Sequence, residues 1–325
     1  MSHPLAKPVA SCSVIVCTYN RADSLSLTLD ALRAQVFPTP VDWEVLVVDN
    51  NSRDHTPAVV AQCQREWPRL RYVHEPRQGL SHARNLGIAH ASGDILLFTD
   101  DDVIPENNWV HATVTGLQKH DADACGGPIA PIWEAPPPHW LTPRFHGFLA
   151  IKSGPAEDFE IKSADDLPFG ANMALRRGVF GATGVFDISR GRVGQVLSSG
   201  EDGELFTRVL AAGFKVVFLA DARVHHRIEA HRATRRYLRR WRYETSRNLA
   251  LTYSFQGARL LGIPRFMFRQ LLRAVWRAAV AGLTCNPDEA FNRQLIVAHF
   301  IGLSSGLFRL WLTGSTDFDR DANRP

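Results

Sequence analysis

The chain has 325 residues, of which 45% are hydrophobic and 22% are charged, as in an ordinary globular protein with one large domain or two unequal ones. The formal net charge is only +4, but arginine is concentrated after about residue 220, whereas the first half is nearly balanced. These values exclude a chain too small to bury a core, and they indicate that the two parts face different partners.

The five cysteines are odd in number, widely scattered and free of C-x-x-C spacing, so they indicate neither a disulfide framework nor a zinc site. The N-terminus lacks a long apolar segment. Its first hydrophobic run, at residues 14–17, is of strand length and leads into polar residues. We therefore expect a protein of the reducing cytoplasm rather than a secreted one.

Residues 13–129 alternate short β-branched runs with longer amphipathic stretches, which predicts a βαβ sheet wrapped by helices. Residues 45–48 and 95–98 are apolar at successive positions, so both faces of these strands should be covered, as in a parallel sheet. The candidate strands lie at residues 13–17, 44–48, 71–74, 95–98 and 122–125.

Apolar side chains recur at helical spacing after the first candidate strand. Asp23 and Ser24 are the candidate N-caps of this helix, and Ser81 is the candidate cap of a helix that runs to His90. The apolar positions of the first helix are Leu25, Leu29, Leu32 and Val36.

Carboxylates follow two of the apolar strands, with Asp49 after one and residues 100–102 after the other. In open α/β sheets, ligands bind beyond the carboxyl ends of the strands. This rule places residues 18–20, Asp49 and residues 100–102 around one crevice.

Residues 128–168 show no clear periodicity, and their prolines and aromatic residues predict a long irregular loop that is either a binding lid or disordered. Regular structure is expected again in a helix over 201–212 that ends at Gly213, and in a strand at 215–219. A further strand-like segment at 222–224 precedes His225 and His226.

Three consecutive aspartates, Asp100, Asp101 and Asp102, stand directly after a buried strand. Carboxylates at such range repel one another and raise one another's pKa unless a cation offsets them. Mg²⁺ typically shares its site between one or two carboxylates and substrate phosphates. A metal that bridges protein and diphosphate is one interpretation, and a solvated acidic turn is the alternative.

Arg265, Arg269, Arg273 and Arg277 are spaced by four and interleaved with aromatic and aliphatic residues. On a helix this spacing produces a basic stripe beside an apolar face, which is typical of a helix in an anionic membrane surface. The alternative is a helix that packs on the catalytic domain with its arginines in water. The later apolar stretch at residues 295–312 contains His299 and Arg309 and is a poor membrane span.

Six short segments together resemble the successive motifs of glycosyltransferase family 2, whose members have the GT-A fold. Each segment alone is modest evidence, but their order and spacing both match over roughly the first 228 residues. The segments are SVIVCTYNR at 13–21, VVDNNS at 47–52, ARNLG at 83–87, TDDD at 99–102, FGANMA at 169–174 and SGEDGEL at 199–205.

The resemblance implies a Rossmann-like α/β fold with a mostly parallel central sheet flanked by helices. Residues 1–228 would form the catalytic domain, with a nucleotide-binding half at 1–127 and an acceptor half at 128–228. Beyond the resemblance, the arginine pattern predicts a helical extension over residues 229–325, which either meets an anionic membrane surface through residues 230–312 or only packs on the domain.

The resemblance also implies a donor pocket in which Thr18, Tyr19, Asn20 and Asp49 receive the base and ribose, since an aromatic face stacks on a base and a carboxylate accepts its hydrogen bonds. Arg84 would hold a phosphate oxygen. Taken singly, Tyr19 can be an ordinary aromatic residue, Asp49 a turn residue and Arg84 part of a surface salt bridge.

For the cation, Mn²⁺ or Mg²⁺, the resemblance implies direct coordination by Asp102. Asp100 would contact the ribose or the metal, and Asp101 would contribute charge to the donor site. His226 would complete the metal or diphosphate site, with a purely structural histidine as the alternative.

The resemblance assigns Asp202 as the general base that accepts the proton of the acceptor hydroxyl, with inversion at the anomeric carbon. Glu201 would lie beside it in the donor site, although both carboxylates can also be helix caps. Gly170 would let the backbone approach the donor sugar, and Asn172 would bond a sugar hydroxyl.

The implied function is an inverting, metal-dependent glycosyltransferase that moves a sugar from a nucleotide-diphosphate donor, with a UDP-sugar expected, to a glycan or lipid-linked acceptor in cell-surface polysaccharide synthesis. The expected location is cytoplasmic, at the inner face of the membrane. The alternatives are a non-catalytic nucleotide-sugar-binding protein and a sugar nucleotidyltransferase. No nucleic-acid-binding motif accompanies the arginines, so nucleic acid is not an expected partner.

Overall fold

The computed structural model describes residues 11–194, 196–197, 199–250, 255 and 257–314. The described residues leave out 251–254, 256 and 315–325 of the predicted extension and 1–10 at the N-terminus. The chain forms two compact units. The α/β unit comprises Met1–Ile132, Ala150–Ile188 and Glu201–Arg227, and the helical unit comprises Trp133–Leu149, Ser189–Gly200 and Ile228–Pro325.

An eight-stranded sheet forms the centre of the α/β unit, in the order β3-β2-β1-β4-β9-β6-β10-β8. The strands from β3 to β4 pair in parallel, β9 inserts antiparallel between β4 and β6, and β8 runs antiparallel to β10. The strands are β1 (Cys12–Thr18), β2 (Trp43–Asp49), β3 (Leu70–His74), β4 (Ile95–Asp100), β6 (Ala124–Gly126), β8 (Phe159–Glu160), β9 (Met173–Arg176) and β10 (Val216–Phe218). The predicted mostly parallel sheet is thus confirmed.

Both faces of this sheet are covered by apolar side chains. Val45 and Val47 of β2 belong to one core with α1, α2 and α4, and Leu46 and Val48 belong to another with α3, α5 and α6. The successive apolar residues of β2 are therefore explained by burial on two sides. The helices are α1 (Ala22–Arg33), α2 (Thr56–Glu66), α3 (Leu80–His90), α4 (Trp109–Lys119), α5 (Arg177–Thr183) and α6 (Glu201–Ala211).

A small second sheet has the order β5-β11-β7 and consists of β5 (Val103–Pro105), β11 (Val224–Ile228) and β7 (Ile129–Trp133). The expectation that His225 and His226 follow a strand is wrong, because both lie within β11, opposite Ile104 and Val103 of β5. The alternation of buried and partly exposed residues along β11 turns His226 inward.

The expectation of irregular structure over 128–168 holds only in part, because β7 and β8 lie within it. Two 3₁₀ helices, Pro143–Leu149 and Ala164–Asp166, also interrupt it. Backbone pairing with distant strands orders these short segments, and sequence periodicity does not report such pairing.

The predicted helix caps are wrong. Asp23 and Ser24 lie inside α1, whose N-cap is Arg21, and the Ala22 N–H donates to Asp54 Oδ2 at 3.2 Å. Ser81 lies inside α3, which follows Gly79 at φ 141°, a backbone angle that favours glycine. In both cases a tertiary contact or a glycine replaces the local side-chain cap.

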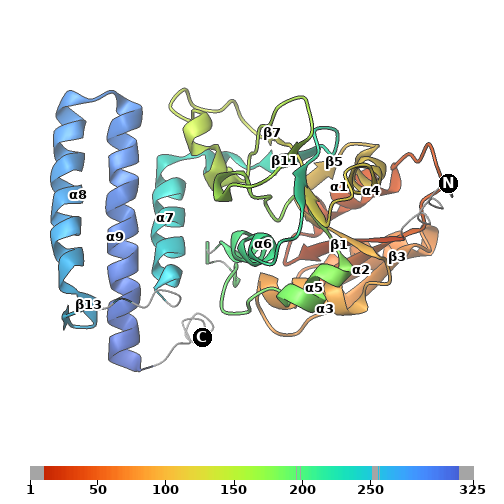
Figure 1. Ribbon diagram of the computed structural model, residues 1–325, viewed down its shortest axis with the longest axis horizontal. Helices are drawn as coiled ribbons and strands as arrows, with labels where there is room; N and C mark the ends of the chain where they lie inside the picture. Colours follow the sequence, from red (N-terminus) through yellow and green to blue (C-terminus); the bar gives the residue numbers. More distant parts are fainter. Residues whose placement is uncertain (1–10, 195, 198, 251–254, 256, 315–325) are drawn as a thin grey trace, which may run out of the picture. The chain divides into compact units, whose positions relative to one another are not determined.

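In the helical unit, α9 lies between α7 and α8 (Figure 1). Gly302 and Gly306 of α9 face the backbone of α7 so closely that a Cβ atom on either would overlap the carbonyl oxygens of Tyr243 and Arg247. This four-residue spacing of small residues lets two helix backbones touch. The helices are α7 (Arg235–Leu249), α8 (Arg265–Thr284) and α9 (Pro287–Thr313).

Aromatic residues from the expected lid pack at the N-terminal end of α9. The ring of Phe291 lies 5.2 Å from that of Trp140 and 5.3 Å from that of Phe145. Arg144 also pairs with Glu289 at 2.8 Å. These side chains form part of the interior of the helical unit, so this part of the loop is ordered.

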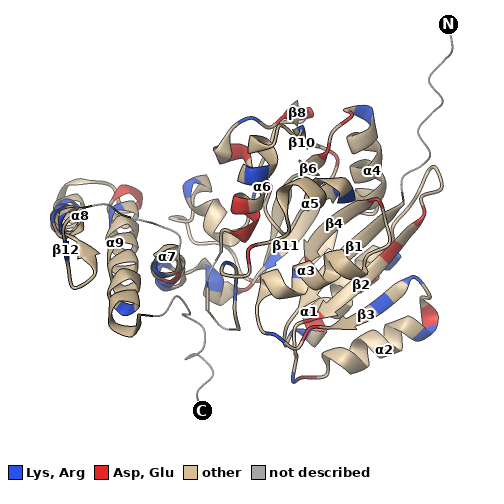
Figure 2. Ribbon diagram, turned by 60° about the horizontal axis from the view of Figure 1, so that its bottom comes forward, with Lys and Arg blue, Asp and Glu red and all other residues tan. Residues whose placement is uncertain are grey.

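Among the described residues, α9 is the one helix long and apolar enough to cross a membrane by length and composition, which differs from the expectation that this stretch is a poor span. About 28% of its most apolar window is buried inside the protein. Figure 2 marks the arginines of α7 and α8 in the same unit.

Candidate active site

Three strands of the α/β unit end with a polar residue at the same edge of the sheet. Thr18 ends β1 opposite Asp49 of β2, and Cys17 stands opposite Asp100, the last residue of β4. Because parallel strands bring their carboxyl ends together, the residues predicted to surround one crevice do converge.

Asp49 is only 1% exposed and accepts two hydrogen bonds. The Tyr72 hydroxyl donates to its Oδ2 at 2.7 Å, and the backbone N–H of Ser52 donates to its Oδ1 at 2.9 Å. Burial and the bond to Asp49 raise the pKa of Tyr72 above its usual range. Asp49 therefore orders the turn after β2, and Tyr72 is a neighbour that the sequence analysis did not identify.

The turn after β1 is held by the loop that follows β2. Asn20 adopts a positive φ of 53°, its Oδ1 accepts the Arg53 N–H at 2.7 Å, and its own N–H donates to Ser52 Oγ at 2.9 Å. Tyr19 is partly exposed beside it. The segment 18–20 is thus fixed in shape before any ligand binds.

The acidic residues form the tight turn between β4 and β5. Asp101 is buried, and its Oδ2 accepts a hydrogen bond from the Thr18 hydroxyl at 2.7 Å. Burial, together with repulsion from the neighbouring Asp102 carboxylate, raises the pKa of Asp101 from its ordinary value of 3.8 to about 7. The fully solvated acidic turn considered from the sequence is wrong for Asp101 and Asp102, which are both 7% exposed.

Two basic side chains from different elements face Asp102. The guanidinium of Arg21 donates to Asp102 Oδ2 at 2.8 Å, and His226 Nε2 lies 3.3 Å from Asp102 Oδ1. His226 is 2% exposed, and the Arg227 N–H donates to the Asp102 carbonyl at 2.9 Å, so β11 is attached to the acidic turn. His225 points elsewhere and lies 3.3 Å from Glu106.

This donor set fits a divalent cation. Mg²⁺ and Mn²⁺ prefer carboxylate ligands and share their coordination shell with water and substrate phosphates, while imidazole suits transition metals. Asp102 and His226 offer one carboxylate and one imidazole. Across the described residues there is no group of three or more His, Cys, Asp or Glu that could hold a metal ion.

Arg84 is enclosed rather than exposed, so the surface-salt-bridge interpretation is wrong. Its Nη1 donates to Glu201 Oε1 at 2.8 Å, and its Nη2 lies 3.5 Å from Asp100 Oδ1. Burial, together with repulsion from Asp202, raises the pKa of Glu201 in spite of the opposing Arg84 charge. Glu201 Oε2 is buried without a hydrogen-bond partner among the described residues.

Asp202 lies in the first turn of α6 and is partly exposed. Its Oδ2 accepts the Gly170 N–H at 2.8 Å and its Oδ1 accepts the Gly203 N–H at 2.8 Å. Each carboxylate oxygen retains a second lone pair. The side chain is therefore fixed in position and can still accept a proton.

Asn172 is buried, and its amide is engaged inside the protein. Its Nδ2 donates to the carbonyls of Pro128 and Ala222 at 3.0 and 2.8 Å, and its Oδ1 accepts the Trp109 indole N–H at 2.9 Å. The contact with a sugar hydroxyl stays a prediction, for which Oδ1 retains a second lone pair.

Sequence reasoning missed Arg21 as a partner of Asp102. Arg21 was visible only as the last residue of the SVIVCTYNR segment, and nothing in the sequence indicates that its side chain turns toward residue 102. Trp109 was also missed, because an indole that supports an amide resembles any other buried aromatic residue.

Two solved glycosyltransferase structures superpose on this chain. The mannosyltransferase PcManGT from Pyrobaculum calidifontis, in complex with GDP-Man and Mn²⁺, superposes with a TM-score of 0.58 at 19% identity over 89% of this chain and 86% of that one. GalNAc-T7 with UDP, GalNAc and Mn²⁺ superposes with a TM-score of 0.52 at 19% identity over 75% and 51%. At these identities the likeness shows the fold alone, and the predicted GT-A fold with a C-terminal helical region is confirmed.

The family model described as glycosyl transferase family 2 matches residues 13–184, more than half of the chain. The chain therefore belongs to glycosyl transferase family 2. It is 29% identical to the succinoglycan biosynthesis protein ExoM of Rhizobium meliloti over 310 residues, 91% of this chain and 92% of that protein. It is 28% identical to the glucosyl-dolichyl phosphate glucuronosyltransferase of Haloferax volcanii over 235 residues, 68% and 70% of the two chains.

Proposed function

We propose that this glycosyltransferase is an inverting, metal-dependent enzyme that takes its sugar from a nucleotide-diphosphate donor, with a UDP-sugar as the expected donor. The observation that carries the proposal is the approach of Asp102 and His226 to 3.3 Å at the carboxyl edge of the sheet. A carboxylate and an imidazole in this arrangement suit a cation that also binds diphosphate.

The pocket for the base and ribose is proposed at Thr18, Tyr19, Asn20 and Asp49. Tyr19 is partly exposed, and Asp49 is held in place by two hydrogen bonds, which supports a preformed recognition edge. Asp100, which is partly exposed, would contact the ribose or the cation from the end of β4. Asp101 would contribute negative charge and hold Thr18.

The reaction is proposed as a single displacement. The acceptor oxygen forms a bond to the anomeric carbon, the bond from that carbon to the diphosphate breaks, and Asp202 accepts the hydroxyl proton. Attack from the face opposite the leaving group inverts the configuration. A bound divalent cation would offset the charge on the departing diphosphate.

The acceptor is proposed to be a glycan or a lipid-linked sugar of cell-surface polysaccharide synthesis. The names of the two relatives, one a succinoglycan biosynthesis protein and the other a transferase to a dolichyl-phosphate sugar, support this class. The five cysteines are free in the structure, which fits the reducing cytoplasm.

The test is a panel of nucleotide sugars assayed for nucleotide release with and without Mn²⁺ or Mg²⁺. We expect release with at least one donor, and loss of metal-dependent release in Asp102→Ala. Asp30→Ala serves as a matched control, because Asp30 is an exposed aspartate on α1.

Two results would contradict the proposal. Donor binding without turnover of donor or acceptor would favour the nucleotide-sugar-binding protein. Release of pyrophosphate from a nucleoside triphosphate and a sugar phosphate would favour the nucleotidyltransferase.

We also propose that the outer face of α8 lies in an anionic membrane surface. Met267, Ala274 and Ala281 of this helix are buried, whereas Leu272, Trp276 and Leu283 are 70%, 66% and 89% exposed. Monomeric proteins rarely leave such large side chains together in water without a partner. The apolar row and its arginines match the pattern of an interfacial helix.

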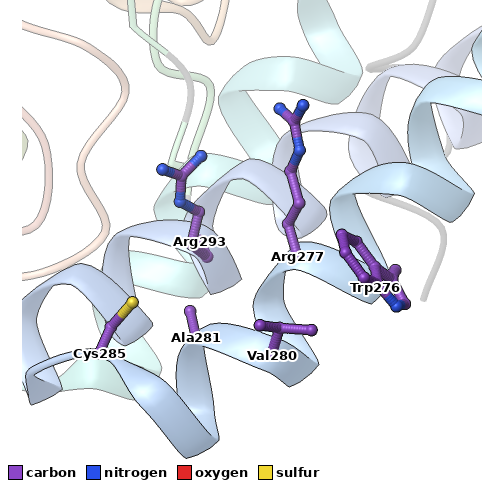
Figure 3. A pocket seen from close by; sticks show the side chains of 6 residues that line it. All are labelled: Trp276, Arg277, Val280, Ala281, Cys285 and Arg293. Atoms are coloured by element: carbon purple, nitrogen blue, oxygen red, sulfur yellow. The ribbon is translucent and has the colours of Figure 1, made fainter.

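Basic and apolar side chains of α8 and α9 also line a surface cavity of about 410 Å³ (Figure 3). Arg277 of α8 and Arg293 of α9 extend to the same side of the cavity, which Trp276 and Val280 also line. Guanidinium groups beside apolar side chains suit the boundary between lipid head groups and acyl chains.

Co-sedimentation with phosphatidylcholine vesicles, with and without anionic phosphatidylglycerol, tests this surface. Arg269→Gln with Arg273→Gln is expected to lower partitioning into anionic vesicles roughly 30-fold, because each arginine contributes about 1 kcal/mol near such a surface. Arg65→Gln, which removes an exposed arginine of α2, is the control. Failure of the wild type to co-sediment at low salt would favour helices that only pack within the protein.

A further inference from the structure

Arg84 is enclosed on several sides by protein atoms. The Phe186 ring lies under its guanidinium, 5.3 Å from the centroid, and Gly170 approaches so closely that a Cβ atom would overlap Arg84 Nη2. The side chain is 4% exposed. A phosphate oxygen could reach this guanidinium only after Glu201 or Asp100 had moved away.

The two carboxylates that contact Arg84 come from distant parts of the chain. Asp100 ends β4 and begins the acidic turn, and Glu201 begins α6. Nη1 is bonded to Glu201 at 2.8 Å and Nη2 lies 3.5 Å from Asp100, so one planar cation connects the strand to the helix.

The residue after Glu201 is Asp202, and it is attached to the same cluster from the other side. Gly170 donates its N–H to Asp202 Oδ2 at 2.8 Å and also packs against Arg84. The Asp202 carboxylate is thus held by Gly170, which packs against Arg84, and it is carried by the turn whose first residue, Glu201, is bonded to Arg84.

A buried ion pair is weak evidence for stability, because desolvation opposes the attraction of the two charges. Specific geometry is the better explanation for an arginine and a glutamate that are 3% and 4% exposed. Here that geometry places the first turn of α6 against the acidic end of β4.

We propose that Arg84 and Glu201 form a buried bridge that positions Asp202 toward the donor-binding edge, so that both are positioning residues and Arg84 does not bind the diphosphate. The proposal rests on the proposed role of Asp202 as the base. It differs from the phosphate contact that the resemblance to the family implies for Arg84.

The test compares Arg84→Lys, Glu201→Gln and their double variant in steady-state kinetics, in direct donor binding with Mn²⁺, and in thermal unfolding. A misplacement of about 1 Å in a reacting group can cost 100-fold in rate, so each single variant is expected to lower kcat about 10- to 100-fold. The donor Kd should stay within about twofold of the wild type. The double variant should be no slower than the slower single variant, because the residues act as one unit.

Arg71 and Glu44 provide a matched control pair, because Arg71 Nη1 bonds Glu44 Oε2 at 2.6 Å near the start of β2. Arg71→Lys and Glu44→Gln should leave kcat unchanged. A donor Kd raised tenfold or more in Arg84→Lys, but not in Glu201→Gln, would overturn the proposal in favour of a phosphate ligand. Rate losses that multiply in the double variant would also overturn it.

Asp202→Asn separates this inference from the proposed function. If Asp202→Asn turns over normally, the base assignment is wrong, and with it the positioning role. If Asp202→Asn is inactive while Glu201→Gln keeps full kcat, only the bridge is wrong. Non-additive changes in unfolding temperature would support the bridge without any assay of activity.

Discussion

The two units depart from ordinary burial in opposite ways. The α/β unit buries charged side chains at one edge of its sheet, with Asp49, Arg84 and Glu201 all less than 5% exposed. The helical unit does the reverse, because α8 exposes Leu272 and Leu283 to water. Buried charge and exposed apolar surface are the two unusual observations, since exposed polar and buried apolar residues are expected everywhere.

The contrast accords with the two different partners proposed for the units. Buried carboxylates at the end of β4 repel one another, so a cation and a diphosphate would lower the free energy of that site. Exposed leucine and tryptophan on α8 would suit the proposed lipid surface.

The largest effect is expected from Asp202→Asn. Loss of a general base lowers kcat by about 100- to 10,000-fold, and an asparagine of the same shape keeps the hydrogen bond from Gly170. Nucleotide release is the measurement, with vesicle binding as the second readout. Vesicle binding is expected to be unchanged. Loss of both nucleotide release and vesicle binding would contradict the assignment of the two functions to different units.

The next effect is in the helical unit. Gly302→Ala places a methyl group against the Tyr243 carbonyl and should destabilise the packing of α7 on α9 by about 1–3 kcal/mol. Gly282→Ala is the control, because nothing lies near its Cβ position in α8, and it should stabilise the helix by up to about 1 kcal/mol. Thermal unfolding followed by circular dichroism measures both changes in stability. Equal effects in the two variants would contradict the close contact between the backbones of α7 and α9.

A smaller effect concerns pH and the α/β unit. The pKa of Asp101 is raised from 3.8 to about 7, so the folded state holds this proton more tightly than the unfolded chain does. Its contribution to stability is present below about pH 4 and is lost as the pH rises through about 7. In metal-free buffer we expect the unfolding temperature to fall over this interval and Asp101→Asn to flatten the fall, whereas Asp30→Asn should not.

The smallest effect concerns the helical unit, where a lowered pKa makes stability fall as the pH falls. Burial and the nearby Arg242 lower the pKa of His299 from 6.5 to about 4, and His299 Nδ1 contacts Ser246 Oγ at 2.8 Å. Its contribution is present above about pH 6.5 and is lost as the pH falls to about 4. Unfolding of His299→Gln should vary less with pH over that range, whereas the exposed His55→Gln should behave as the wild type does.

The sheet was predictable because its central strands are buried on both faces, so residues 45–48 and 95–98 had to be apolar at every position. The insertion of β9 between β4 and β6 was not predictable, because residues 173–176 pair with strands nearly 50 and 80 positions earlier. Pairing across such separations leaves no mark on local periodicity.

At the site, the sequence placed Thr18, Asp49 and Asp100 correctly at one edge, because carboxyl ends of parallel strands must meet there. The surroundings of Arg84 could not be foreseen, since its partner Glu201 lies 117 residues away. The inward direction of His226 could have been predicted from its position two residues from both Val224 and Ile228, which are buried in the same strand. The contact of α9 with α7 could have been predicted from the four-residue spacing of Gly302 and Gly306.

The amide of Asn172 has a consequence for protein engineering. Pro128 precedes the segment 129–171 and Asn172 follows it. Because the Asn172 amide donates to the carbonyls of Pro128 and Ala222 and accepts the Trp109 indole N–H, the two ends of this segment are held together. The positions of the two ends therefore do not depend on the number of residues between them. We expect that the exposed residues 135–137 of this segment tolerate changes of length and sequence, while the strands that carry the acidic turn keep their places.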